Sequence, residues 1–352
     1  MSAKKSRAIV CTVTILAVIF IFAINNGYSA QISFMAGDVK VIRDGKEMKA
    51  QFQMKLDSGD VLKTGKMAFA DVSYEDGTLI KVKENSSVTI GSKSAEGSDA
   101  LSVTGGLISA KFAKLQKGSE RKVYTPTTVC AVRGTEFDVA VSESADSNIQ
   151  LSEGALALLN PYGITSIKKN QNAEARVGSS PKLTKGGDLE EWKAENESQL
   201  DNNPEKQSNA FEKYLQTFEN RNKNASSDIN RLEKNQNAAA TGGKEKMEKA
   251  NAEIEDIHAN VEDDMYLNAA ANKSIDGILN RFAKDKKDMY DIFLKIKEES
   301  NKVLEQQKKN YEAIMAVKEA YKKAYEEIMK KHKDAIDKIK GSIDLEGVKP
   351  KK

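Results

Sequence analysis

The stretch Val123–Val141, VYTPTTVCAVRGTEFDVAV, decides the fold of this chain. It begins with a β-branched and aromatic strand pattern that stops at Pro126, because proline has no N–H to donate to a β-ladder. The next run, Thr128–Val132, is β-branched and apolar, which predicts a strand buried on both faces. The stretch therefore predicts closely spaced strands at the centre of a β-domain.

The segment Arg133–Thr135 interrupts this pattern. Gly134 supplies either a β-bulge or a positive φ, which a residue with a Cβ adopts only at a cost. After it, apolar positions alternate with others through Glu136–Val141, which is the period of a half-buried strand. Ile149–Asn160 (IQLSEGALALLN) then predicts two more strands around a turn at Gly154.

These motifs resemble the FecR domain, a family named after the regulator of ferric-citrate transport. The resemblance continues upstream, where Leu56–Gly65 (LDSGDVLKTG) is similar to the family's L-x-x-GD-x-L-x-T-G signature and Tyr74–Ile90 contains its DGT segment. It covers about Phe34–Asn170, less than half of the chain. The motif residues are Gly59, Asp60, Asp76, Gly77, Thr125, Pro126, Arg133, Gly134, Thr135, Phe137 and Gly154. Arg133 could bind an anion or donate to carbonyl groups of its own turn, and we favour the structural role.

Recurring glycine turns predict that residues 34–177 form an all-β domain, either a small solenoid or a rolled sandwich. Residues 178–188 (GSSPKLTKGGD) have the composition of a linker. Residues 189–200 predict a short helix, whose Trp192 we expect to pack on the β-domain rather than stack on a ligand. The predicted fold class is α+β in separate domains: an all-β FecR-like domain followed by a long, partly coiled-coil-like helical region.

Residues 203–341 are predicted to be helical, starting with Pro204 after an asparagine cap. The glycine pair at 242–243 predicts a break, followed by a helix from about Lys246 to Ala271. Residues 342–352 are expected to form a basic flexible tail.

The last helical part carries a regular apolar stripe. Apolar residues recur at intervals of seven at Ile275, Phe282, Met289, Ile296 and Val303. This part could be one helix or two, broken near Ser300 and Asn301. The stripe could pack in an intrachain bundle, which we favour, or support self-association through residues 275–339 as a coiled coil.

Residues 1–30 have the pattern of a signal peptide or of a single transmembrane helix that serves as an anchor. Lys4, Lys5 and Arg7 precede the uncharged apolar run Ala8–Ile24. The run is long for a signal peptide and short for a membrane span, so cleavage and retention are open alternatives. In both cases we expect the remaining chain in the periplasm or facing it from the inner membrane.

Charge is balanced along the chain, which carries 55 basic and 52 acidic residues and a net charge of +3. Residues 201–352 contain 30 of the basic and 29 of the acidic side chains, so both parts are near neutral. We therefore expect no nucleic-acid partner. Cys11 and Cys130, the two cysteines, predict no disulfide framework.

No catalytic, metal-binding or cofactor motif occurs, and we expect no enzyme and no cofactor. The acidic surroundings of His258 predict a solvated helix face rather than a metal site. His332 is expected to be packed or to face a partner. Cys130 is expected to be a small buried apolar residue.

These observations predict a non-catalytic exported protein that acts as a binding or scaffold module of the bacterial cell envelope. Its partner would be an envelope protein or a wall polymer. The resemblance to FecR implies the alternative, a sensor or regulatory protein that relays an extracytoplasmic signal. Because only Met1–Arg7 precede the apolar run, too few residues for a specific interface with a sigma factor, we expect the signal to be reported to another envelope component.

Overall fold

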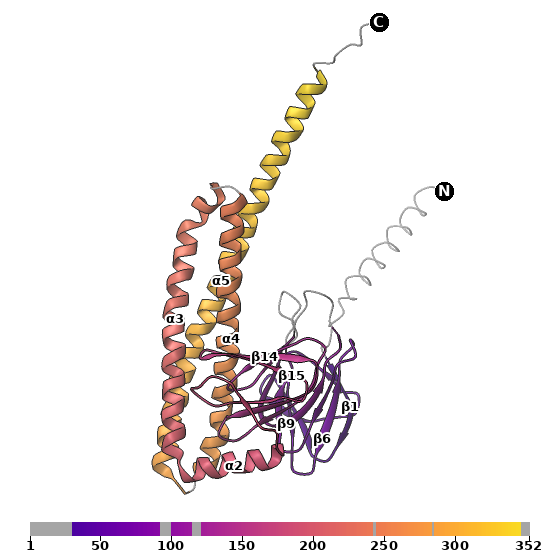
Figure 1. Ribbon diagram of the computed structural model, residues 1–352, viewed down its shortest axis with the longest axis vertical. Helices are drawn as coiled ribbons and strands as arrows, with labels where there is room; N and C mark the ends of the chain where they lie inside the picture. Colours follow the sequence, from indigo (N-terminus) through magenta and orange to yellow (C-terminus); the bar gives the residue numbers. More distant parts are fainter. Residues whose placement is uncertain (1–29, 92–99, 115–120, 242–243, 284, 346–352) are drawn as a thin grey trace, which may run out of the picture.

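The β-domain and the helices pack against each other in the computed structural model (Figure 1). The structure describes residues 30–91, 100–114, 121–241, 244–283 and 285–345. It confirms the predicted fold class, an all-β domain followed by a long helical region. The predicted signal or anchor lies outside the described residues, apart from Ala30, the first residue of a strand. Within the described ranges, no helix has both the length and the hydropathy needed to cross a membrane.

The β-domain is a rolled sandwich of two sheets that share one strand. Sheet 1 contains, in spatial order, β4 (Lys55–Leu56), β1 (Ala30–Ala36), β6 (Phe69–Ser73), β7 (Leu79–Val82), β9 (Ala100–Lys111), β12 (Glu136–Val141), β13 (Ser147–Glu153), β16 (Asn172–Ala175) and β17 (Lys182–Thr184). Sheet 2 contains β3 (Lys46–Lys49), β2 (Val39–Arg43), β5 (Val61–Thr64), β8 (Ser87–Thr89), β9 again, β10 (Arg121–Tyr124), β11 (Val129–Val132), β14 (Ala155–Asn160) and β15 (Gly163–Lys168). Neighbouring strands are antiparallel except β9 and β10.

The long strand β9 passes from one sheet to the other. Its first half pairs with β8 in sheet 2, and its second half, from Gly106 onward, pairs with β12 in sheet 1. Gly106 has a φ of +86°, and a Cβ there would lie 2.2 Å from Ser86 Oγ. The crossing therefore requires glycine, because any other residue is strained and collides with its neighbour.

The alternation in the central stretch directs its apolar side chains inward as predicted. Phe137, Val139 and Val141 are each at most 1% exposed, and Phe137 stacks on Phe112 with ring centroids 5.7 Å apart. Ala140, on the opposite face of β12, is also buried, because it packs against Leu189 and Trp192. These two residues belong to α2 (Leu189–Asn202), which lies against sheet 1.

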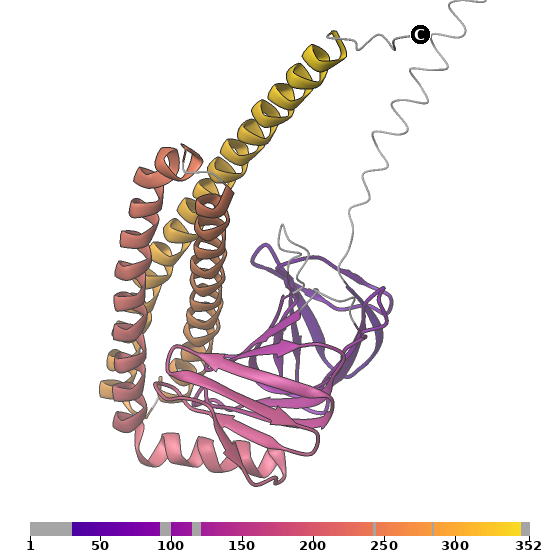
Figure 2. The ribbon, with the colours of Figure 1, turned by 45° about the horizontal axis from the view of Figure 1, so that its top comes forward.

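The remaining helices form an intrachain bundle beside the β-domain, and α2 crosses its lower end (Figures 1 and 2). They are α3 (Pro204–Thr241), α4 (Lys244–Phe282) and α5 (Lys287–Leu345). The end of α5 extends past the hairpin of α3 and α4 (Figure 2). There Met329, Ile336 and Ile339 are between 50% and 59% exposed.

The break in the last helical part lies between Phe282 and Lys287, not near Ser300 as one alternative had it. Ser300 is 1% exposed, and its hydroxyl group donates to Asn268 Oδ1 and accepts from Asn272 Nδ2 at 2.9 and 3.0 Å. The polar residues of α5 thus join α4 in a buried hydrogen-bonded layer, which interrupts the apolar pattern without ending the helix. α5 also continues past Gly341 to Leu345.

Residues 178–188, expected to be a linker, contain β17, which pairs with β16 in sheet 1. Its Leu183 is 56% exposed. This short edge strand therefore lacks the alternation of buried and exposed positions from which a sequence predicts a strand. The segment ends at Asp188, whose Oδ1 accepts hydrogen bonds from the N–H groups of Glu190 and Glu191 at 2.8 and 3.0 Å. Asp188 is thus the N-cap of α2.

Candidate functional site

The motif residue Asp60 fixes the turn between β4 and β5. Its carboxylate is 1% exposed and accepts hydrogen bonds from Arg43 Nε at 2.9 Å and from the N–H of Asp57 at 2.8 Å. The preceding Gly59 has a φ of +90° and donates its N–H to the carbonyl of Ile90 at 2.9 Å. A buried carboxylate with these donors is fully engaged within the fold, so its role is structural.

A second motif carboxylate, Asp76, joins the two halves of the β-domain. It accepts from the N–H of Thr78 at 2.9 Å across a turn in which Gly77 has a φ of +89°. Arg121 of β10 lies 2.8 Å from the Asp76 carboxylate, donates to Thr78 Oγ1 at 2.6 Å and covers the ring of Tyr74. The turn between β6 and β7 is therefore held by a strand that follows it by some forty residues.

The motif residues Thr125 and Pro126 form the turn between β10 and β11, under the helices. Thr125 Oγ1 accepts from the N–H of Thr128 at 3.0 Å and from Ser147 Oγ at 2.8 Å. The carbonyl oxygen of Pro126 accepts a hydrogen bond of 3.1 Å from the hydroxyl group of Tyr214 in α3. This turn thus connects the β-domain directly to the bundle.

Gly134 and Gly154 mark two places where the chain changes sheet. Gly134, between β11 and β12, has a φ of +66°, and a Cβ there would lie 2.9 Å from Lys114 Cγ. Gly154 has a φ of +94°, and its Cβ would lie 2.7 Å from Thr135 Cγ2. β13 and β14 on either side of Gly154 belong to different sheets, so the predicted turn is a crossing and not a hairpin. Arg133 is exposed and makes no hydrogen bond to another described residue.

A polar contact joins α4 to β10. Asp263 accepts from Tyr124 Oη at 2.8 Å and from Lys122 Nζ at 2.7 Å. The Tyr124 ring stacks on Tyr266, with centroids 4.6 Å apart. Burial, with the nearby carboxylate of Asp263, raises the pKa of Tyr124 well above its usual value, so its hydroxyl stays protonated and donates.

The acidic cluster around His258 is therefore not the solvated helix face that the sequence suggested. His258 is 6% exposed and packs against Tyr311, with ring centroids 5.4 Å apart. Asp264 pairs with Arg221 of α3 at 2.5 Å. The expectation was wrong because the partners of these acidic residues lie on α3 and β10, far from α4 in the sequence.

An apolar core spans the same contact. It contains Tyr124, Val129, Ala145 and Val177 of the β-domain together with Phe211, Tyr214, Phe218, Leu267, Ala271 and Ile275 of the helices. The predicted burial of the β11 strand on both faces follows from this, because Val129 faces the helices while Cys130 and Val132 face the sandwich core. The β-domain and the bundle thus share one buried core.

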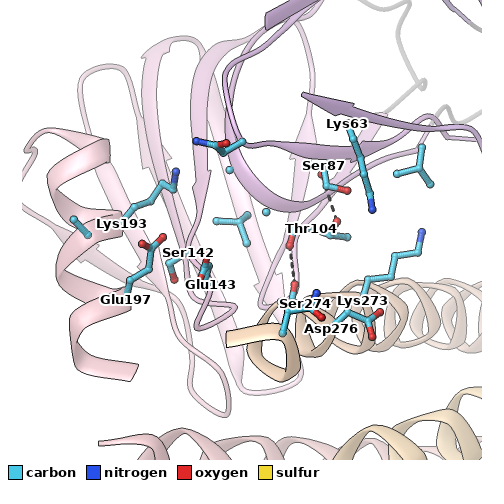
Figure 3. A pocket seen from close by; sticks show the side chains of 18 of the residues that line it. Lys63, Ser87, Thr104, Ser142, Glu143, Lys193, Glu197, Lys273, Ser274 and Asp276 are labelled. Atoms are coloured by element: carbon cyan, nitrogen blue, oxygen red, sulfur yellow. Dashed lines mark hydrogen bonds between the residues drawn. The ribbon is translucent and has the colours of Figure 1, made fainter. Parts of the chain in front are cut away.

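Beside this contact lies a cleft of about 740 Å³ between the β-domain, α2 and α4 (Figure 3). Its floor includes Gly105, Gly106 and Val141, at the point where β9 changes sheet. Ser274 of α4 donates to the carbonyl of Thr104 at 2.8 Å and so closes one side. None of the motif residues lines this cleft.

Seven charged side chains line the cleft. Three of them are in ion pairs that do not involve the other four: Lys193 pairs with Glu190 at 3.3 Å, and Asp276 pairs with Lys297 of α5.

The other four charged side chains form two like-charged pairs. The lysine pair consists of Lys63 of β5 and Lys273 of α4, and both ammonium groups reach the same end (Figure 3). The glutamate pair consists of Glu143, in the loop before β13, and Glu197 of α2. Sequence reasoning missed all four, because they belong to four separate elements and none is a signature residue of a motif; Lys63 occupies a variable position of LDSGDVLKTG.

The described residues contain no group of three or more His, Cys, Asp or Glu side chains that could hold a metal ion. Cys130 is 0% exposed, and burial raises the pKa of its thiol to about 12. A thiol in this state is protonated at neutral pH and cannot act as a nucleophile. It is a small buried apolar residue, as the sequence predicted.

Comparison with known proteins agrees with the motif assignment. Residues 60–157 match the family model described as FecR protein, so the chain contains a FecR domain. Two crystal structures of a candidate anti-sigma factor from Parabacteroides distasonis are similar, each with 14% sequence identity and a TM-score of 0.33. The similarity covers 38% and 39% of this chain and 62% and 64% of those chains, so this chain spans less than two thirds of their length. The comparison with curated proteins finds no match.

Proposed function

We propose that this protein is a non-catalytic sensor or regulator of the FecR kind, in which the β-domain receives an extracytoplasmic signal and the helices pass it on. Its expected location is the periplasm, or the inner membrane with the described domains facing the periplasm. The pattern of residues 1–30 and the match to the FecR family model support this location.

The observation that carries the proposal is the contact between the FecR domain and the bundle. The turn at Pro126, a motif residue, accepts a hydrogen bond from Tyr214 of α3, and Tyr124 donates to Asp263 of α4. A rearrangement of β10 or of this turn cannot leave α3 and α4 unchanged, because their side chains share a close-packed core. A β-domain that served only as a binding module carried by the helices would not require such a contact.

The experiment is to delete the gene in its own bacterium and compare transcripts with those of strains complemented by the wild type or by variants. A regulatory function predicts a defined set of changed transcripts, which the wild type restores. Asp263→Asn keeps the shape of the side chain but weakens its ion pair with Lys122, so we expect incomplete restoration. Asp256→Asn, at an exposed position of the same helix, is the matched control and should restore fully. Unchanged transcripts in the deletion strain would contradict regulation.

A scaffold or binding module of the envelope is the second candidate, and the end of α5 favours it. Met329, Ile336 and Ile339 are exposed on a segment that extends past α3 and α4. Exposed apolar residues at helical spacing suit a protein partner in the envelope. Cross-linking in the intact envelope from Ile336, followed by identification of the attached molecule, tests this candidate.

A further inference from the structure

We propose that the cleft in Figure 3 binds a short zwitterionic peptide. Its carboxylate lies at the lysine pair, Lys63 and Lys273, and its ammonium group lies at the glutamate pair, Glu143 and Glu197. This deepens the proposed sensory function by naming the class of signal. Binding of the peptide does not depend on the proposed sensory function; only the consequence of binding rests on it.

The lysine pair has no carboxylate of its own in the described part of the chain, because Asp276, the acidic residue next to Lys273 in Figure 3, pairs with Lys297. Among the described residues, neither Lys63 nor Lys273 forms an ion pair, although Lys273 Nζ donates to Thr89 Oγ1 at 3.0 Å. Burial, and then the charge of Lys63, lower the pKa of Lys273. A carboxylate between the two ammonium groups accepts hydrogen bonds from both and relieves their repulsion.

The glutamate pair requires a cation rather than an anion. Glu197 forms no ion pair with a described residue, and burial, followed by the charge of Glu143, raises its pKa. Glu143 is paired with Arg281, which also binds Asp201 at 2.5 Å, so one cation already serves two carboxylates. The charges of Lys193 and Arg281 also act on Glu197. Lys193, however, is paired with Glu190, and Arg281 with Glu143 and Asp201. A ligand ammonium group next to Glu197 supplies a positive charge that no other carboxylate shares.

Part of the cleft, next to Gly277 and Gly105, is not filled by any described side chain of the protein. Gly277 lies within α4, where glycine costs about 1 kcal/mol relative to alanine. A Cβ on Gly277 or on Gly105 would meet no atom within 4 Å. No contact within the chain therefore requires glycine at 277, and the absence of a side chain there leaves room for a ligand close to the α4 backbone.

The same lining disfavours other ligand classes. A phosphate or other polyanion suits Lys63 and Lys273 but meets the negative charge of Glu197 at the opposite side. Ile42, Val61 and Val141 supply apolar surface for small side chains. A volume of about 740 Å³ lies within the range of small-molecule pockets and accommodates a few amino acids.

Binding is tested by calorimetric titration of the purified protein with trialanine. N-acetyl-trialanine lacks the cation and trialanine amide lacks the anion, so each capped peptide should bind at least about tenfold more weakly. The all-D isomer of trialanine separates the two sources of such peptides, cell-wall peptides with D-residues and ribosomal peptides. Saturable binding of either isomer supports the site, and the tighter isomer identifies the source. Failure of both isomers to bind, or equal binding of the capped peptides, overturns the proposal.

Variants locate the binding within the cleft. Lys273→Gln and Glu197→Gln should each weaken trialanine binding about tenfold or more, with an unchanged circular dichroism spectrum. The matched controls are Lys249→Gln on α4 and Glu195→Gln on α2, exposed positions outside the cleft, and they should bind as the wild type does. Gly277→Ala should weaken binding without lowering the melting temperature. Equal losses in the controls overturn the assignment.

The transcript experiment separates this proposal from the sensory function. If deletion of the gene changes transcripts but trialanine does not bind, the cleft assignment is wrong and the sensory function stands. If trialanine binds and transcripts do not change, the peptide site stands and the sensory function is wrong.

Discussion

The hydroxyl group of Tyr214 in α3 donates a hydrogen bond of 3.1 Å to the carbonyl oxygen of Pro126, at the tip of the turn that carries the TP motif. Both residues are buried, and Tyr214 also stacks on Tyr162 of the β-domain with ring centroids 6.1 Å apart. A motif that belongs to the β-domain by sequence is therefore completed by a helix. The β-domain and bundle behave as one packed unit at this point.

Tyr214→Phe should lower the free energy of unfolding by about 1–2 kcal/mol, because it leaves the buried carbonyl group of Pro126 without this donor. Urea denaturation followed by circular dichroism measures the change. Tyr325→Phe is the control, since the hydroxyl group of Tyr325 makes no hydrogen bond to a described residue. Equal stabilities of the wild type and Tyr214→Phe would mean that the hydrogen bond contributes nothing net.

The strands around Val123–Val141 could be predicted because their signals are local. Alternating burial in β12 and the positive φ of Gly134 follow from residue type and spacing over a few positions. The family resemblance located the strands and turns for the same reason, since its motifs consist of glycines, a proline and turn carboxylates.

The contacts between distant elements could not be predicted in this way. Asp263 appeared to belong to a solvated helix face, yet its partners Lys122 and Tyr124 lie about 140 residues earlier. The cleft is a still clearer case, because Lys63, Lys273 and Glu197 follow no periodic pattern and meet only through the docking of α2 and α4 on the β-domain. A single sequence carries no local signal for such a meeting.

Gly134→Val should destabilise the β-domain by about 1–3 kcal/mol, because valine is strained at a φ of +66° and its Cβ would approach Lys114. The measurement is the melting temperature, which should fall by several degrees. Gly187→Val is the control, since a Cβ there would meet nothing within 4 Å. If both variants melt like the wild type, the crossing between β11 and β12 adapts to a side chain.

Phe282→Glu should disrupt the bundle, because it places a charge at a position that is 2% exposed and in contact with Phe293, at a cost of several kcal/mol. Loss of helical circular dichroism signal measures the effect. Ile336→Glu makes the same chemical change on the extended end of α5, where the side chain is 52% exposed, and should leave helicity and melting unchanged. A change in sedimentation of Ile336→Glu alone would show that the end of α5 mediates self-association.

Asp146 should make stability depend on pH. Burial raises the pKa of its carboxyl group to about 6, although the N–H of Val177 donates to it at 2.9 Å. The folded state therefore holds a proton that the unfolded chain, with a pKa near 3.8, releases earlier. Stability falls as the pH rises from about 4 to about 6, and the loss persists above that range.

Asp146→Asn removes this loss, because the amide is neutral at every pH and its Oδ1 can still accept from Val177. Relative to the wild type, the variant should gain on the order of 3 kcal/mol at pH 7.5 and about 1 kcal/mol at pH 4.5, since about two pKa units separate the folded and unfolded carboxyl groups. Urea denaturation at the two pH values measures the difference. Other titrating groups, among them Asp264 with a pKa raised by burial to about 6, are present in both proteins and cancel. An equal gain at both pH values would attribute the effect to packing and not to ionisation.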